Sequence, residues 1–351
     1  MVNNKRKNEH VALTELLYKE HQHSDFDDLH YIHHSLPEVN LCDIDISTRL
    51  ATYSINQPFF INAMTGGTDI TKKINEKLAI VVRETGLVIA TGSLSAVLKD
   101  SYVESSFRII REINPKGIIF ANIGAGQTVE NAQKVIDLID ANALQVHLNA
   151  PQELIMPDGD KDFKGWLSNI EKMVSKISIP IIVKEVGFGM SSRTIKQLID
   201  IGVKYIDISG KGGTNFAKIE NYRREDYKLS YLENWGQSTV ASLLEAATFI
   251  DQVDIYASGG IRNPLDLVKA LSLGAKAVGI SGYFLHFILN KGIDETIKEI
   301  ISWKEQIKTI MALLGKKTIK DLIDTDVLIM GNVRDYCISR GIDYLKYSKR
   351  L

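Results

Sequence analysis

The chain has 351 residues, 44% of them hydrophobic and 24% charged, which is typical of a globular protein with one large domain or two ordinary ones. Its formal net charge of -1 gives no overall positive field, so we expect no nucleic-acid partner. Its longest apolar runs, such as residues 179–183, are far shorter than the roughly 18 residues of a membrane span, so we expect no membrane partner either.

The amino-terminal segment shows no repeating strand pattern. It begins MVNNKRKNEHVALTE, which is basic but has no apolar core behind it and therefore does not resemble a signal peptide. Cys42 and Cys337 lie far apart, and two free thiols in a cytoplasmic protein are the better interpretation. A zinc site is conceivable but lacks a fourth-ligand pattern, although six of the eight histidines fall in the first 34 residues, including His21, His23, His33 and His34.

From Pro58 onward a short β-branched apolar run, a polar or glycine-rich break and a helical segment repeat along the chain. The segment 128–140 predicts a helix, since its apolar residues from Val129 to Ile139 fall on one face. Another helix is predicted to start at Pro264 after Asn263 and to end before Gly274. The eight apolar runs cover residues 58–64, 86–92, 117–124, 143–149, 180–187, 204–210, 253–260 and 276–282.

Eight strands that are each followed by a helix predict an α/β fold, a closed (β/α)8 TIM barrel, for which about 250 residues is typical. A doubly wound parallel sheet is the alternative. No Pro-, Gly- or Ser-rich linker divides the chain, so we expect one domain over residues 1–351. Within it, we expect residues 1–55 to form an amino-terminal extension and residues 283–351 to form a helical carboxyl-terminal tail.

The carboxyl ends of the predicted strands collect glycine and polar residues. Barrel active sites form at these ends, and a phosphate site is usually made by the last two loops. The stretches SGGIRNP (258–264) and ISGYF (280–284) offer backbone amides there without bulky side chains, although glycines can also serve only tight turns. We therefore expect a phosphate group at these two loops.

Lys184 ends the fifth strand and would point a fixed charge into the barrel mouth. A lysine beside the pyrimidine edge of a flavin would stabilise the anion formed on reduction. Thr65, Ser93 and Asn122 offer neutral hydrogen bonds from other strands, as a flat heterocycle requires. A Schiff-base lysine or a plain surface lysine are the alternatives for Lys184.

Several longer stretches together resemble the type 2 isopentenyl-diphosphate isomerase family. They are FINAMTGGT (60–68), QVHLNAPQELIMPDGD (145–160), VKEVGFGMS (183–191), GGTNFAKIENYRR (212–224) and WGQST (235–239). RKNEH (6–10) and FDDLHYIHHSLPEV (26–39) fit the same family, so the resemblance covers nearly the whole chain.

The resemblance implies an enzyme of isoprenoid biosynthesis that interconverts isopentenyl and dimethylallyl diphosphate. It implies reduced FMN, Mg²⁺ and NADPH as the reductant, and a homo-oligomer, either a tetramer or an octamer. FMN contacts would fall at Ala63, Met64, Thr65, Ser93, Asn122, Lys184, Ser209 and Thr214. The FMN phosphate would lie at Gly259, Gly260, Arg262, Ser281 and Gly282.

The same resemblance assigns the substrate site. Gln152 would lie by the isoprenoid carbons and position or relay the proton, and Glu153 would bind magnesium. His147 would bind the diphosphate or the flavin surroundings, or else be a core histidine. The diphosphate would be held by Arg6, Lys7, His10, Ser93, Leu94 and Ser95.

One motif departs from the family. Relatives often have Gln followed by a basic or sulfur-containing residue where this chain reads GSLSAVLKD (92–100), and a leucine at 94 cannot donate a hydrogen bond to diphosphate. The contribution of this loop is therefore in doubt.

Three rival functions stay open. One is an FMN-dependent oxidoreductase of the 2-hydroxy-acid oxidase type on the same barrel, which would need a base and an arginine that SGKGGTNF (209–216) lacks. The others are a flavin-binding redox sensor and a Schiff-base lyase.

Overall fold

The computed structural model describes residues 2–18 and 23–350, and its centre is a closed barrel of eight parallel strands. Each strand pairs with the next one along the chain, and the last pairs with the first, so that Val278 lies opposite Phe59. This closure confirms the TIM barrel and excludes the open doubly wound sheet. The barrel strands are β4 (Phe59–Ile61), β5 (Ile89–Ala90), β6 (Ile119–Gly124), β7 (Ala143–Leu148), β8 (Ile181–Glu185), β9 (Tyr205–Asp207), β10 (Asp254–Ser258) and β11 (Ala277–Ile280).

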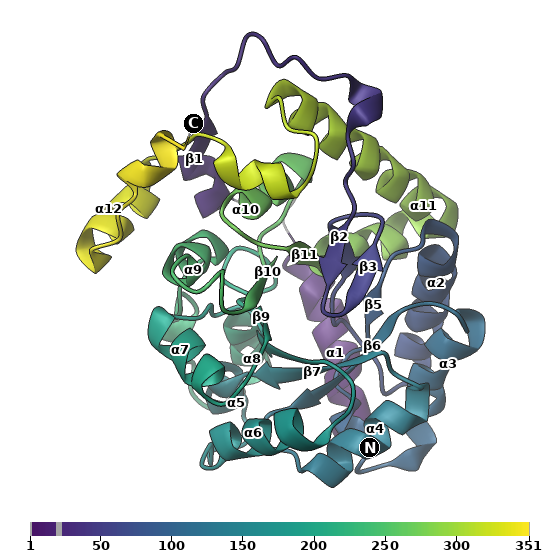
Figure 1. Ribbon diagram of the computed structural model, residues 1–351. Helices are drawn as coiled ribbons and strands as arrows, with labels where there is room; N and C mark the ends of the chain where they lie inside the picture. Colours follow the sequence, from purple (N-terminus) through teal and green to yellow (C-terminus); the bar gives the residue numbers. More distant parts are fainter. Residues whose placement is uncertain (1, 19–22, 351) are drawn as a thin grey trace.

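Helices surround the barrel as an outer ring (Figure 1). α11 packs between α10 and α2 and so occupies the place of the eighth barrel helix. Gly292 interrupts the helical backbone of α11. The helices that follow barrel strands are α2 (Asp69–Thr85), α3 (Ser105–Ile113), α4 (Val129–Ile139), α5 (Ala150–Ile155), α6 (Trp166–Lys176), α7 (Ser192–Asp200), α8 (Phe216–Arg223), α9 (Thr239–Ala246), α10 (Pro264–Ser272) and α11 (Gly282–Leu313).

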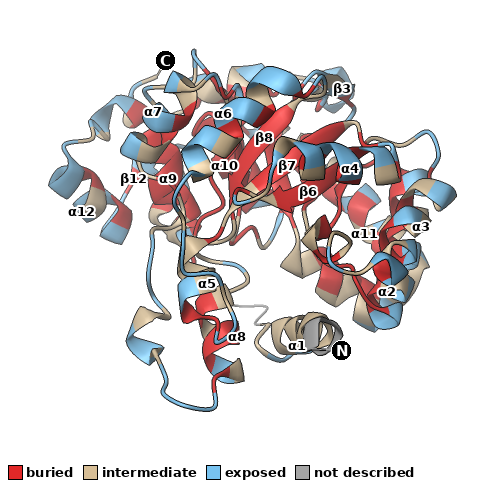
Figure 2. Ribbon diagram, turned by 90° about the horizontal axis from the view of Figure 1, so that it is seen from below, coloured by how far each residue is buried: buried red, intermediate tan, exposed pale blue. Residues whose placement is uncertain are grey.

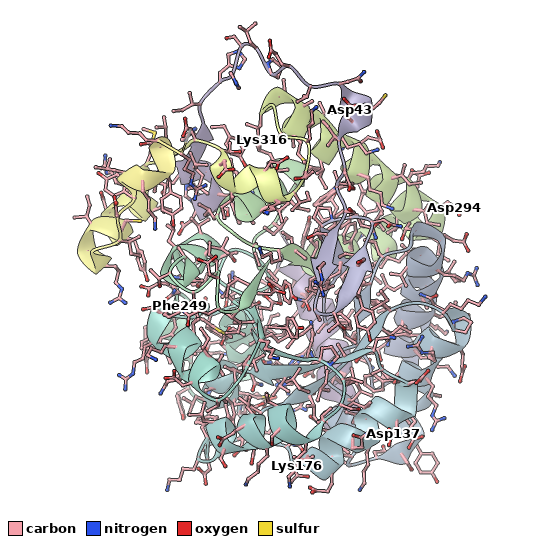
Figure 3. The ribbon with its side chains drawn as sticks, viewed as in Figure 1. Asp43, Asp137, Lys176, Phe249, Asp294 and Lys316 are labelled. Carbon is pink, nitrogen blue, oxygen red and sulfur yellow. The ribbon has the colours of Figure 1, made fainter. Side chains whose placement is uncertain are left out.

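Both helices predicted in detail form as their sequences indicate. In α4 the side chains of Ala132, Val135 and Ile136 are buried against the barrel. In α10 the side chain of Asn263 accepts a hydrogen bond from the backbone N–H of Asp266, which caps the helix just before Pro264. Side chains fill the space between ring and barrel, whereas exposed residues such as Asp137 and Lys176 lie at the periphery (Figure 3).

A short hairpin covers the amino-terminal end of the barrel. Its strands are β2 (Thr48–Leu50) and β3 (Tyr53–Ile55), and Leu50 and Ile55 are buried against side chains that point into the barrel. The backbone N–H of Ala51 donates a hydrogen bond of 2.6 Å to the buried hydroxyl of Tyr256. This end is therefore apolar and closed by the hairpin, while polar groups concentrate at the other end.

The two terminal segments of the chain meet. β1 (Leu29–Tyr31) pairs antiparallel with β12 (Val327–Ile329), and α12 (Gly331–Arg340) follows it. The tail expected to be helical over 283–351 thus contains a strand, because Val327 and Ile329 bury their side chains when paired with the amino-terminal extension. Within the described ranges, no helix is both long and apolar enough to cross a bilayer.

Candidate active site

A cavity of about 850 Å³ lies at the carboxyl ends of the barrel strands. Helix α1 (Val2–Leu16) lies beyond this end of the barrel beside α8, on the side opposite the hairpin (Figure 2). The volume is within the range of roughly 300–1,000 Å³ common for small-molecule sites. The cavity is therefore large enough for a cofactor with a substrate beside it.

The cavity wall gathers nearly all of the residues that the sequence indicated. They come from α1, from the strand ends and from the loops after them. The predicted residues that line it are Arg6, Lys7, His10, Ala63, Met64, Thr65, Ser93, Ser95, Asn122, His147, Gln152, Glu153, Lys184, Ser209, Thr214, Gly259, Gly260, Arg262, Ser281 and Gly282.

Leu94 is the exception. Its side chain is fully buried in the hydrophobic core and does not line the cavity, because the 3-10 turn Leu94–Ala96 directs it inward. The Leu94 side chain is therefore not placed to contact a ligand in the cavity, in line with the doubt that the sequence raised about this loop. The same loop nevertheless reaches the cavity through Ser95 and Lys99, and Lys99 was not singled out from the sequence.

The loops after β9 and β10 approach each other so closely that glycine is required. Gly259 has a φ of +92°, and a Cβ there would collide with the carbonyl oxygen of Gly210. A Cβ on Gly260, whose φ is +75°, would lie 2.9 Å from the Cα of Gly212. These loops thus bring bare backbone to the cavity at the start of α10, an arrangement suited to an anion.

Arg262 lines the cavity beside these glycines, but its guanidinium is already paired. It donates to Asp266 at 2.7 Å and to Asp27, in the amino-terminal extension, at 2.6 Å. The hydrogen bond from Arg262 holds the pKa of Asp27 down at about 2. The arginine therefore ties the extension to the barrel, in addition to any role toward a phosphate.

Lys184 is buried on β8 and reaches the cavity. Its Nζ donates a hydrogen bond of 2.6 Å to the carbonyl oxygen of Glu185. Burial lowers the pKa of Lys184, whereas the nearby carboxylates of Asp207 and Glu185 raise it. This is not a surface lysine, so that alternative is excluded.

Gln152 lies in a network that the sequence did not reveal. Its Nε2 donates to Glu220 Oε1 at 3.0 Å, and His10 Nε2 lies 2.8 Å from the same oxygen. Arg223 donates to the other oxygen of Glu220 at 2.5 Å. Burial raises the pKa of Glu220, but these neighbours outweigh it and the net shift is downward.

Glu220 was missed because its motif shows only a helix of mixed polarity. A buried carboxylate in the part of α8 that faces α1 becomes visible only when the two helices are brought together. The one available signal was the acid three positions before Arg223 within the family-like stretch GGTNFAKIENYRR.

Glu153 is half-buried near the end of α5. Its carboxylate accepts hydrogen bonds from Asn149 Nδ2 at 2.9 Å and from the backbone N–H of Asp160 at 2.8 Å. Residues 2–18 and 23–350 contain no group of three or more His, Cys, Asp or Glu able to hold a metal. A cation at Glu153 would therefore need ligands from water or substrate. The same ranges contain no cluster that matches the zinc site considered from the sequence. His21 lies outside the described residues.

Two cations of α1 face the cavity. Burial and the neighbouring Arg6 lower the pKa of Lys7 to about 8. The guanidinium of Arg6 lies 3.6 Å from the carboxylate of Asp158. The amino-terminal pair is therefore part of the cavity wall and not a solvated tail.

The barrel and its cavity define an FMN-type barrel enzyme, and comparison with known proteins gives the same class. The family model for FMN-dependent dehydrogenases matches residues 123–329, more than half of the chain. Among solved structures, the flavin-binding domain of baker's yeast flavocytochrome b2 aligns with a TM-score of 0.68 at 20% identity, covering 89% of this chain and 81% of that one. A lactate oxidase of Pediococcus acidilactici aligns with a TM-score of 0.66 at 16% identity, covering 92% of this chain and 87% of that one. These structures share the fold.

Curated relatives are much more similar. The isopentenyl-diphosphate delta-isomerase of Staphylococcus saprophyticus is 50% identical over 96% of this chain and 97% of the relative. The enzyme of the same name from Latilactobacillus sakei is also 50% identical, over 96% of each chain. The chain belongs to the isopentenyl-diphosphate delta-isomerase family, in its FMN-dependent, type 2 form.

Proposed function

We propose that this enzyme interconverts isopentenyl and dimethylallyl diphosphate by an allylic proton shift that depends on reduced FMN. The observation that carries the proposal is a cavity whose wall joins the glycine loops and buried Lys184 with Gln152 and the cations of α1. Family membership supports the same reaction.

The residues present fit FMN. Gly259 and Gly260 let the loops after β9 and β10 pack closely, and they bring bare backbone to the cavity wall, where a phosphate could bind. Lys184 is a buried cation with no salt-bridge partner within the described residues, so a ligand that gains negative charge would satisfy it. When bound, reduced FMN supplies a proton donor and acceptor beside the substrate double bond.

The protein's own groups would orient the substrate without attacking it. Gln152 donates its amide N–H to Glu220, which fixes the side chain and leaves a neutral carbonyl toward the cavity. A neutral amide can hold an allylic carbon skeleton in place, whereas a strong nucleophile or bulk water would intercept a cation. Glu220, buried behind Gln152, holds this orientation by accepting the amide N–H.

The substrate diphosphate would lie against α1. Arg6 supplies a planar fork of donors and Lys7 a compact charge, and both line the cavity. Glu153 would share Mg²⁺ with phosphate oxygens and water, because magnesium commonly takes only one or two protein carboxylates. Ser93 and Ser95 would add hydroxyl donors from the loop after β5.

Three further features belong to the proposal. NADPH is the expected reductant, the protein is expected to act in the cytoplasm, and it is expected to assemble as a tetramer or octamer. A 2-hydroxy-acid oxidase activity is the alternative. It is disfavoured because the loop over residues 209–216 has neither the histidine nor the arginine that such chemistry needs.

The direct test incubates FMN-loaded, dithionite-reduced protein with isopentenyl diphosphate and Mg²⁺ without air, and quantifies dimethylallyl diphosphate. We expect Gln152→Leu to lower kcat at least tenfold. Gln133→Leu is the matched control, since Gln133 is exposed on α4 and bonds only to Asp137 among the described residues. Absence of product from protein that retains FMN would refute the proposal.

A further inference from the structure

A row of buried polar side chains crosses the barrel interior beneath the cavity. Asn62 on the end of β4 donates from Nδ2 to Asp207 Oδ2 at 2.7 Å. Gln145 on β7 donates from Nε2 to Asn62 Oδ1 at 2.9 Å. All three side chains are at most 2% exposed, so these hydrogen bonds form out of contact with solvent.

The row continues to His147. Asn122 on β6 donates from Nδ2 to Gln145 Oε1 at 3.1 Å. Its other amide atom, Oδ1, lies 2.7 Å from His147 Nδ1. Three amides therefore connect the carboxylate of Asp207 to one ring nitrogen of His147.

Two fixed groups set the direction of the first amide. The backbone N–H of Ala63 can only donate, and it points to Asn62 Oδ1 at 2.8 Å. The carboxylate of Asp207 already accepts from Ser258 Oγ at 2.7 Å, and it faces the opposite side of the Asn62 amide. Asn62 must therefore turn its oxygen toward Ala63 and its NH₂ toward Asp207.

Each later amide follows from the one before it. The oxygen of Asn62 requires the NH₂ of Gln145, whose oxygen then requires the NH₂ of Asn122. Only the oxygen of Asn122 is left for His147, so the proton of this contact belongs to Nδ1. Reversing any one amide would place two donors or two acceptors together at a buried site.

The other ring nitrogen of His147 then carries no proton in the neutral ring. Burial, Lys184 and Lys7 lower the pKa of His147 to about 3, so the ring is neutral near pH 7. These two cations are the charged groups that act on it, one from β8 and one from α1. Nε2 has no hydrogen-bond partner among the residues the structure describes, and His147 lines the cavity.

We propose that Gln145 is a positioning residue that fixes His147 as its Nδ1–H tautomer, so that His147 presents a hydrogen-bond acceptor, Nε2, to the cavity. Gln145 is fully buried and does not line the cavity, so it can act on His147 only through Asn122. For the reaction, which rests on the proposed function, neutral His147 can receive a hydrogen bond from a cofactor N–H or a metal-bound water. In this neutral tautomer Nε2 carries no proton to donate to a diphosphate oxygen.

The tautomer can be measured without substrate or turnover. Protein labelled with ¹⁵N-histidine and loaded with FMN gives long-range ¹H–¹⁵N spectra in which protonated and bare ring nitrogens are well separated. The His147 signals are identified by their loss in His147→Gln. We expect wild-type protein to show one tautomer, with Nδ1 protonated. Because no activity is read, failure of this inference is distinguishable from failure of the isomerase proposal.

A matched pair of variants tests the role of Gln145. Gln145→Met keeps the length of the side chain but releases the Asn122 amide, so both tautomers of His147 should appear in comparable amounts. Gln145→Glu should retain the Nδ1–H tautomer, since a buried neutral carboxyl donates to Asn62 and accepts from Asn122 as the amide does. If Gln145→Glu does not fold, the spectra of the wild-type and Gln145→Met proteins still decide the inference.

Three results would overturn the inference. One is a wild-type spectrum with the proton on Nε2. Another is an unchanged single tautomer in folded Gln145→Met. The last is loss of the Nδ1–H tautomer in a folded Gln145→Glu protein.

Discussion

At the residue scale, Lys184 is the residue on which we propose that FMN binding depends most. Lys184→Met keeps the chain length but removes a charged donor worth about 1.5–3 kcal/mol. FMN should therefore bind about ten- to a hundredfold more weakly. The measurement is a fluorescence titration of apoprotein with FMN. Lys176→Met, at an exposed lysine at the end of α6, is the control and should leave affinity unchanged. Equal affinities in both variants would remove Lys184 from the site.

Glu153 gives a second test at this scale. Glu153→Gln keeps the shape of the side chain but removes the anionic oxygen that a hard cation prefers. We expect activity at limiting Mg²⁺ to fall at least tenfold and to recover only in part at high Mg²⁺. Glu171→Gln, at an exposed acid on α6, should retain the wild-type magnesium curve. If both variants keep that curve, the metal is held elsewhere.

The sequence predicted single site residues well where position along a strand decides the outcome. Lys184 and Asn122 lie in strands whose ends can be counted from the apolar runs, so their arrival at the cavity follows from the barrel. Leu94 and Glu220 differ because their surroundings are set by a 3-10 turn and by the contact between α8 and α1. Nothing in the local pattern encodes either feature.

At the scale of elements, one buried carboxylate, that of Glu245, binds two residues of α12. Glu245 on α9 accepts from Arg340 Nε at 2.6 Å and from the Tyr336 hydroxyl at 2.9 Å, both on α12. It also accepts from the backbone N–H of Ser192 on α7. Burial raises the pKa of Glu245, but these hydrogen bonds outweigh it and hold the pKa at about 2.

A depressed folded-state pKa fixes the sign of the pH effect. The stabilisation from Glu245 is complete above its ordinary pKa of 4.5 and is lost as pH falls toward 2. The protection factors for amide hydrogen exchange in α12, which remove the intrinsic pH dependence of exchange, should therefore fall over this window more than those in α4. Glu245→Gln should destabilise the protein by about 2 kcal/mol and make the protection of α12 less dependent on pH there. Equal protection factors in α12 at pH 5 and pH 3 in wild-type protein would contradict this account.

Helix α1 is the second element whose role can be isolated. It is anchored to α8 by the 3.0 Å ion pair between Glu9 and Arg223 and to α11 by the contact of Glu15 with His286 at 2.8 Å. Removing residues 1–10 takes away Arg6 and Lys7, so KM for isopentenyl diphosphate should rise at least tenfold while FMN stays bound. Glu9→Gln loosens the anchor but keeps both cations, and should change KM much less. Unchanged kinetics in the truncated protein would leave this segment without a role in binding.

The elements themselves were predictable to different degrees. All eight barrel strands follow from continuous apolar runs between glycine-rich breaks, and the helices between them from their periodicity. The pairing of β1 with β12 and the hairpin of β2 with β3 were not foreseen. These strands have three residues each, too few to show a period. β1 and β12 form because distant parts of the chain meet, whereas β2 and β3 form a local hairpin that packs on the barrel.

At the scale of the whole molecule, the polar groups of the candidate site gather at one end of the barrel. The hairpin closes the apolar end, so the polar groups have one large cavity in common, and α1 lies over its mouth. The loops proposed to bind the cofactor and the residues proposed to bind substrate thus line the same cavity, which suits chemistry in which the cofactor stays in place while substrate enters and leaves.

That arrangement predicts how the reductant is used. Isopentenyl and dimethylallyl diphosphate have the same oxidation level, so their interconversion consumes no electrons. We therefore expect reduced FMN to be required but not used up. A catalytic amount of NADPH, without air, should support many turnovers, and the oxidised enzyme should be nearly inactive. An oxidoreductase on the same barrel would use one equivalent of reductant or oxidant for each product molecule. The deciding measurement is the ratio of dimethylallyl diphosphate formed to NADPH oxidised under anaerobic conditions. A ratio fixed at one would exclude isomerisation. A ratio that keeps growing after the NADPH is exhausted fits only an allylic proton shift among the functions considered.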